Sequence, residues 1–260
     1  MNIASKSLIE PKIVQYIAKQ YHPLDYSPSL KALIKTAFPD DNLDGVTKYE
    51  LHDTLNSLIF DNYNGEQLFK YRLFKEYFSH QDVVGAFEIK VNNSRADFLS
   101  INGHSSCFEI KTALDNFSKF TKQASDYMKA FEYNYLIIDK CHLAKAEEIL
   151  PNGFGLWIYK NGKINKIKKA RLNETIDHET QLKLLTQKEL INIFPEADLD
   201  RLKILERYSG ATINSRFKKA LKKRYSKRWK FLVNHHETIF PVDLQFFFNN
   251  NILPSNIYYH

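Results

Sequence analysis

Two carboxylates and a lysine near the middle of the chain have the types and the spacing that metal-assisted chemistry needs. Asp97 is followed, after eleven residues, by Glu109, Ile110 and Lys111. Mg²⁺ prefers hard oxygen ligands and usually keeps several waters, so Asp97, Glu109 and the main-chain carbonyl of Ile110 could supply one side of its shell. Lys111 could hold the attacking water and offset charge that develops on a phosphate. The pattern predicts a Mg²⁺ site for phosphodiester hydrolysis, in which Mn²⁺ could substitute.

Alternating apolar and polar residues predict that this group lies on two paired strands. The strands are expected at Arg95–Ile101 and Ser106–Lys111, with a turn at Asn102 and Gly103. An Asn-Gly pair between two alternating runs is a strong hairpin signal. Side chains alternate across a sheet, so the charged residues of the second strand share one face, and pairing can bring Asp97 onto it.

The neighbouring segments predict an α/β core with a mixed sheet and helices on its faces. The expected order is helix, three antiparallel strands, helix and a buried strand: Asn64–Phe78, Val83–Val91, Arg95–Ile101, Ser106–Lys111, Asn116–Glu132 and Tyr135–Ile138. A helix and a second hairpin are expected to follow, at His142–Leu150, Leu156–Tyr159 and Lys163–Lys168.

Hydrophobic periodicity divides the chain into three expected parts. Residues 1–60 form a helical amino-terminal region, 61–170 the α/β core, and 171–260 a basic, mainly helical region. Apolar residues three and four apart predict the first helices, at Ser7–Tyr21, Ser29–Phe38 and Thr47–Phe60. Leu182–Leu232 also reads as helical, whereas the aromatic, Asn-rich tail from Phe240 has no assignment.

The run Arg95-Ala96-Asp97, then eleven residues, then Glu109-Ile110-Lys111, resembles the PD-(D/E)XK nuclease superfamily and its restriction-endonuclease-like fold. Ala96-Asp97 stands where that superfamily usually has Pro-Asp. Residues 95–139 are similar to an uncharacterised bacterial, phage and mobile-element subfamily, and the resemblance covers roughly residues 60–140. It implies that Asp97, Glu109 and Lys111 are catalytic, with Asp97, Glu109 and Ile110 around the metal.

The resemblance extends to a Gln-x-x-x-Tyr element. Gln123 and Tyr127 stand four apart and so share one face of the helix after the strands. The resemblance implies that they orient Lys111 or a scissile phosphate; the alternatives are a solvated helix position and a core aromatic. It also implies a glutamate ligand on the helix before the sheet, for which Glu66 is the first candidate and Glu76 the second. Arg95 points the same way as Asp97, toward a phosphate or a nearby carboxylate.

Positive charge is concentrated near the carboxyl end. Residues 201–260 carry a net charge of +9 and residues 1–200 a net charge of −2, which together give the chain its +7. A helix over Arg216–Lys230 would bury a stripe that includes Phe217 and Leu221 and turn its lysines outward. The lysines predicted to contact the DNA backbone are Lys218, Lys222, Lys223 and Lys227. The alternative is an ordinary solvated helix face.

Composition indicates which cellular compartment to expect. The two cysteines, Cys107 and Cys141, lack metal-ligand spacing, which favours a reducing compartment such as the cytoplasm. No activating base is evident for Cys107, so it is not expected to be a nucleophile. No apolar run reaches the length of a membrane span, and the first ten residues lack the pattern of a secretion signal.

The resemblance implies hydrolysis of DNA phosphodiester bonds, by endonucleolytic cleavage, in defence against foreign DNA such as phage or in repair and recombination. Two alternatives stay open. One is a non-catalytic DNA-binding module on the same fold, although the intact set of Asp97, Glu109 and Lys111 disfavours it. The other is an RNA-cleaving toxin or effector. A homodimer, or a protein partner on the helical extensions, is compatible with the sequence.

Overall fold

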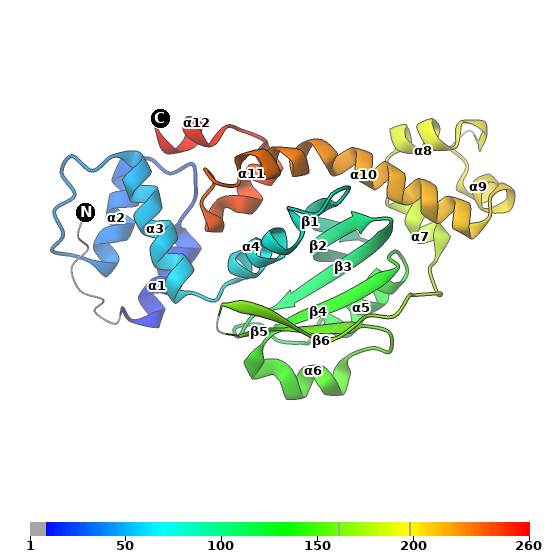
Figure 1. Cartoon of the computed structure of the whole chain (residues 1–260), viewed down its shortest axis with the longest axis horizontal. Helices are drawn as coiled ribbons and strands as arrows, with labels where there is room; N and C mark the ends of the chain where they lie inside the picture. The colour runs from blue at the N-terminus through cyan, green and yellow to red at the C-terminus, as the bar shows by residue number, and fades with distance from the viewer. Residues whose placement is uncertain (1–8, 161, 198) are drawn as a thin grey trace. The chain divides into compact units, whose positions relative to one another are not determined.

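Helices precede and follow a six-stranded mixed sheet (Figure 1). The structure is a computed structural model that describes residues 9–160, 162–197 and 199–260. The chain divides into two units: residues 1–71 with 234–260, and residues 72–233. The sequence predicted an α/β chain, and this is confirmed, whereas the three expected parts remain a prediction.

The sheet follows chain order, β1-β2-β3-β4-β5-β6. Its strands are β1 Val84–Val91, β2 Ser94–Asn102, β3 His104–Lys111, β4 Tyr133–Asp139, β5 Gly155–Lys160 and β6 Lys163–Lys168. The first three strands are antiparallel, β3, β4 and β5 are parallel, and β6 returns antiparallel. Parallel neighbours need a crossover connection, and helix α5 (Phe120–Met128) and helix α6 (Leu143–Ile149) provide the two crossovers. The predicted order of helix, three antiparallel strands, helix and strand is confirmed.

Aromatic side chains fill one face of the sheet. Phe98 and Phe108 have ring centroids 5.9 Å apart, and Trp229 of α10 (Gly210–His235) lies 6.1 Å from Phe98 and 5.3 Å from Phe74 of α4 (Glu66–Tyr77). Gly85 of β1 lies directly under the indole, and a Cβ there would overlap the Trp229 ring. The close packing of α10 on β1 therefore requires glycine at this position.

The opposite face packs against α5 and α6. The buried residues of this layer are Phe120, Ala124, Leu136, Ile138, Ala146, Phe154, Leu156 and Ile158. Helix α5 is shorter than the predicted Asn116–Glu132. The Asn116 side chain accepts hydrogen bonds from the amide and the hydroxyl of Ser118. Such local bonds give the backbone an alternative to the helix, so α5 begins only at Phe120.

Short helices follow the sheet, as the periodicity predicted. They are α7 His178–Lys183, α8 Gln187–Ile193 and α9 Arg201–Arg207, followed by the long α10. Helix α8 begins with a capping box, in which the Thr186 side chain accepts from the Glu189 amide and the Glu189 carboxylate accepts from the Thr186 amide. The expected apolar stripe on α10 is present, since Phe217, Leu221 and Trp229 are buried.

The other unit is helical. It contains α1 Pro11–Gln20, α2 Ser27–Ala37, α3 Lys48–Asn62, the first turns of α4, α11 Leu244–Asn250 and α12 Pro254–Tyr258. The three predicted amino-terminal helices are confirmed, except that Ser7 and Leu8 lie outside the described residues. The tail without a sequence assignment supplies α11 and α12. Among the described residues, no helix has the length and hydropathy needed to cross a membrane.

A polar cluster lies in the core of the helical unit. The Asp243 carboxylate accepts hydrogen bonds at Oδ2 from Tyr21 at 2.9 Å, Tyr258 at 2.8 Å and Asn56 at 3.2 Å. Tyr21 also lies 2.8 Å from Nδ1 of His52. Burial raises the pKa of Asp243 to about 7 and lowers the pKa of His52 to about 4. The cluster ties the carboxyl-terminal segment to α1 and α3.

Candidate active site

Strand register brings Asp97 opposite Glu109. Phe98 of β2 pairs with Phe108 of β3, and the ladder stops there, one residue before the two carboxylates. Residues opposite one another in a ladder point to the same side of the sheet. Asp97 therefore lies on the α5 face with Glu109, while the two phenylalanines point into the aromatic layer. This placement agrees with the face expected from the sequence.

Asp97 ends the ladder with its own side chain. The amide of Ile110 donates to Asp97 Oδ2 over 2.6 Å, so the carboxylate occupies a donor that could otherwise bond the neighbouring strand. The bond fixes the carboxylate beside β3, and Asp97 stays half-buried rather than enclosed. The role expected for the Ile110 carbonyl as a metal ligand remains a prediction.

Glu109 is the centre of a hydrogen-bonded group. Its Oε1 accepts from Lys111 Nζ and from Gln123 Nε2, both at 2.6 Å, and its Oε2 lies 2.7 Å from the hydroxyl of Tyr127. Lys111 also donates to Gln123 Oε1 at 3.2 Å. The Tyr127 hydroxyl is 2.8 Å from the carbonyl oxygen of Arg95, so it spans from β3 to β2. The structure thus places the Gln-x-x-x-Tyr pair against Glu109 and Lys111.

Burial controls the electrostatics of this group. Glu109 is only 2% exposed, and burial raises its pKa, against the opposing effects of Lys111, Tyr127 and Gln123. Burial and the Glu109 charge raise the pKa of Tyr127, which keeps its hydroxyl a donor. Burial, Glu109 and Asp97 likewise raise the pKa of Cys107, so its thiol stays protonated and is no nucleophile.

Glu88 of β1 is a site residue that the sequence reasoning missed. One of its carboxylate oxygens lies within 4.8 Å of one from Asp97. Its φ is +58°, a left-handed conformation that costs free energy for a residue with a side chain. Such strain clusters at functional sites. A signal was present, because a two-residue turn at Asn92 and Asn93 sets Glu88 opposite Asp97.

Two other predicted site residues form ion pairs. The Arg95 guanidinium pairs with the Glu88 carboxylate, so the carboxylate alternative holds for Arg95 in this structure. Glu66 is the first residue of α4, in the helical unit, where its carboxylate pairs with Lys70. Its role as a further metal ligand remains a prediction.

The basic stripe of α10 differs from the prediction at one lysine. Lys218 was expected to face outward, but its ammonium donates to Glu132 Oε1 at 2.8 Å and to the Gly103 carbonyl at 2.6 Å. The Glu132 carboxylate is nearly buried and needs a cation. Lys222 is half-buried, whereas Lys223 and Lys227 are exposed.

Comparison with known proteins gives one broad match. A family model described as Bacteriophage P4 protein cII matches residues 66–247, more than half of the chain. No curated protein matches. Among solved structures, the SPO1766 protein of unknown function from Silicibacter pomeroyi is 18% identical. That alignment covers 54% of this chain and 92% of the other, with a TM-score of 0.35. At this TM-score the similarity supports no inference about fold or function.

Proposed function

The chain belongs to the bacteriophage P4 protein cII family, and we propose that it is a metal-dependent nuclease that hydrolyses DNA phosphodiester bonds. One observation carries the proposal: Glu109, Lys111 and Gln123 form a closed hydrogen-bonded group on the sheet face that also carries Asp97. Carboxylates beside a lysine suit phosphoryl chemistry, in which positioning and charge stabilisation do most of the work. Resemblance to the PD-(D/E)XK superfamily agrees with this assignment.

The donor set fits Mg²⁺. One carboxylate oxygen of Glu88 and one of Asp97 lie within 4.8 Å of each other, which is near enough for both residues to contact one ion. Both residues offer the hard oxygen atoms that Mg²⁺ prefers. Asp97, Glu88, Glu109 and the Ile110 carbonyl would hold the ion. A bound Mg²⁺ would lower the pKa of a coordinated water and polarise a phosphate oxygen.

The side chains around Glu109 have separate roles in this proposal. Lys111 places an ammonium where a phosphate acquires charge, and Gln123 holds that ammonium through its amide oxygen. Tyr127 fixes the Glu109 carboxylate from α5 and, through the Arg95 carbonyl, the strand that carries Asp97. Gln123 and Tyr127 are therefore positioning residues, and the reacting phosphate would meet Lys111.

A cleavage assay tests the proposal. Purified protein is incubated with supercoiled plasmid, linear duplex, branched DNA, single strands and RNA, each with Mg²⁺, Mn²⁺ or EDTA. We expect cleavage of DNA with either metal and none with EDTA. Asp97→Ala and Lys111→Ala should each lower the rate by a factor of about 10² or more, because each removes a metal ligand or a charge-stabilising donor.

Glu148→Ala is the matched control. Glu148 is an exposed acid on α6 with one surface ion pair, to Lys145, and surface pairs contribute little to stability. This variant should cut at the wild-type rate. Cleavage of RNA alone would replace the proposal by the RNA-cleaving alternative. DNA binding without cleavage under any metal would leave the non-catalytic module.

A further inference from the structure

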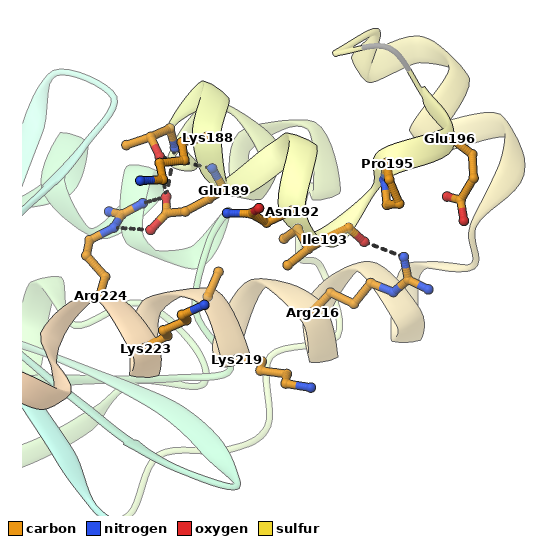
Figure 2. A pocket seen from close by; sticks show the side chains of 12 residues that line it. Lys188, Glu189, Asn192, Ile193, Pro195, Glu196, Arg216, Lys219, Lys223 and Arg224 are labelled. Atoms are coloured by element: carbon orange, nitrogen blue, oxygen red, sulfur yellow. Dashed lines mark hydrogen bonds and ion pairs between the residues drawn. The ribbon is translucent and has the colours of Figure 1, made fainter.

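A groove of about 960 Å³ runs between α8 and α10 (Figure 2). Lys188 of α8 and Lys219 and Lys223 of α10 line it; we call these three the groove lysines. Figure 2 shows Arg224 toward one end of the groove and Arg216 toward the other. The groove lies wholly in the unit that carries the sheet.

The two arginines are fixed in the walls of the groove. Arg224 donates from Nε to Glu189 Oε1 over 2.8 Å. The Arg216 guanidinium lies 4.5 Å from the ring centroid of Tyr208 and 5.1 Å from that of Phe194. Cation–π contacts and ion pairing hold both side chains in place. The arginines thus shape the groove and leave the lysines as its exposed cations.

The groove lysines form a row of positive charge. All three are exposed, and in the part of the chain that the structure describes none of them forms an ion pair. Lys219 and Lys223 are four residues apart, about 6 Å along one face of α10. Like charges at this spacing disfavour a helix, so folding alone does not account for them. A row of cations suits a polyanion with repeated charges.

A second groove, of about 480 Å³, follows the edge strand β1. Glu88, Lys90 and Tyr225 line it, and Arg224 borders both grooves, so the two meet at this side chain. Glu88 is the residue whose carboxylate lies within 4.8 Å of the Asp97 carboxylate. The β1 groove therefore leads from the candidate active site to the groove lysines.

We propose that the two grooves bind the DNA backbone that flanks the bond to be cut, with the groove lysines on its phosphates. The proposal rests on the proposed nuclease function for the position of that bond. Seven cations line the two grooves against three carboxylates, and the exposed ones are lysines. Contacts to the backbone position DNA without reading its sequence.

The first test measures binding in EDTA, where no cleavage can occur. Lys188→Gln/Lys219→Gln/Lys223→Gln is compared with Lys163→Gln/Lys168→Gln/Lys169→Gln, three exposed lysines at the opposite sheet edge. Anisotropy of labelled DNA is titrated at several salt concentrations. The groove variant should bind at least about ten-fold more weakly, and the slope of log K against log salt should be shallower by about 2 to 3. The control should keep both values.

The second test separates positioning from chemistry. At saturating DNA the groove variant should keep the wild-type kcat, because the lysines lie outside the metal site. Its KM should rise for long DNA and stay unchanged for a duplex too short to reach from Asp97 to the groove. A structural defect would change both substrates alike.

Three outcomes would overturn the groove assignment. One is an unchanged affinity and salt slope in the groove variant. Another is displacement of labelled DNA by polyglutamate as effectively as by unlabelled DNA, which would point to an acidic protein partner. The third is tighter binding of RNA than of DNA of equal length. A wild-type protein that binds DNA through the groove lysines but never cuts would overturn the nuclease proposal and leave the groove assignment supported.

Discussion

In each unit of the protein a buried carboxylate contacts at least one tyrosine hydroxyl, and the two carboxylates have different surroundings. Glu109, in the sheet, lies 2.6 Å from the Lys111 ammonium and shares its face with Asp97 and the nearby Glu88. Asp243, in the helical unit, accepts from two tyrosines and Asn56 at Oδ2, and among the described residues Oδ1 has no hydrogen-bond partner. Both have a pKa that burial raises.

Burial and a raised pKa therefore do not by themselves identify a reactive centre. Asp243 is fully buried and lies in a cluster that joins distant segments of the chain. Glu109 combines burial with a cation and with further carboxylates at the same sheet face. The combination, rather than the titration of one acid, is what metal-assisted chemistry requires.

The largest expected difference in cleavage rate comes from replacing each of the two acids by its amide. Glu109→Gln should lower the cleavage rate by a factor of about 10² or more, because the proposed metal site would lose a charged ligand. Asp243→Asn should leave the rate at saturating DNA within about two-fold, since it is not part of the metal site. Rates with Mg²⁺ at neutral pH check both. Equal losses in the two variants would mean that the comparison reports folding, not chemistry.

A smaller effect concerns how stability changes with pH. The pKa of Asp243 in the folded protein, about 7, lies above its value in the unfolded chain. Its contribution to the free energy of unfolding is therefore present below pH 4 and is lost as pH rises toward 7. The folded pKa of His52, about 4, lies below its unfolded value, so its contribution is present above about pH 6.5 and is lost as pH falls toward 4. The two slopes oppose each other, and the wild type should be nearly flat from pH 4 to 6.5.

Each single variant should show the pH dependence of stability that the remaining residue causes. Asp243→Asn leaves His52, so stability should rise with pH by about 1.4 kcal/mol per unit from 4 to 6.5. His52→Gln leaves Asp243, and stability should fall by the same amount per unit. Urea denaturation followed by circular dichroism measures both, with Asp40→Asn, an exposed acid of the same unit, as control. Parallel curves for all four proteins would contradict the two pKa shifts.

The smallest effect tests the strained backbone at Glu88. Glycine in a strand is normally less stable than alanine, by roughly 0.5–1 kcal/mol. At a φ of +58° the order should reverse, with Glu88→Gly more stable than Glu88→Ala by about 1 kcal/mol. Both variants should lose metal-dependent cleavage. If alanine is the more stable of the two, position 88 is not strained in solution.

Local patterns predicted the sheet and most of the candidate site. The period-two runs were enough to predict one sheet face for Asp97 and Glu109. The register was not predicted, because a two-residue turn at Asn102 and Gly103 would set Asp97 opposite Phe108, whereas the ladder pairs Asn102 with His104. Glu88 was missed because its position follows from the turn at Asn92 and Asn93, which the sequence prediction did not include. Lys218 was misplaced because its partner Glu132 lies 86 residues away.

Hydrogen bonds between residues far apart in the sequence also explain why the carboxyl-terminal tail had no assignment from the sequence. Asp243 makes its bond to Asn56 across 187 residues of chain, and Tyr21 is 222 residues from Asp243. Neither partner has a periodic signal, since Asn56 is a single polar residue on the buried side of α3 and Tyr21 lies just after the end of α1. Such contacts form only when the core is assembled, so pattern reading could not anticipate them.

Both tryptophans of the chain lie in the unit that carries the sheet. Trp229 lies on α10 and packs on Gly85, and Trp157 lies on β5. The sequence of the helical unit contains tyrosine but no tryptophan. Tryptophan emission is therefore an intrinsic probe of one unit alone, while far-ultraviolet circular dichroism records the helices of both. Melting curves from the two signals would coincide if the units unfold together and separate if each unfolds independently. Unfolding of the unit that carries the sheet can thus be followed without an added fluorophore.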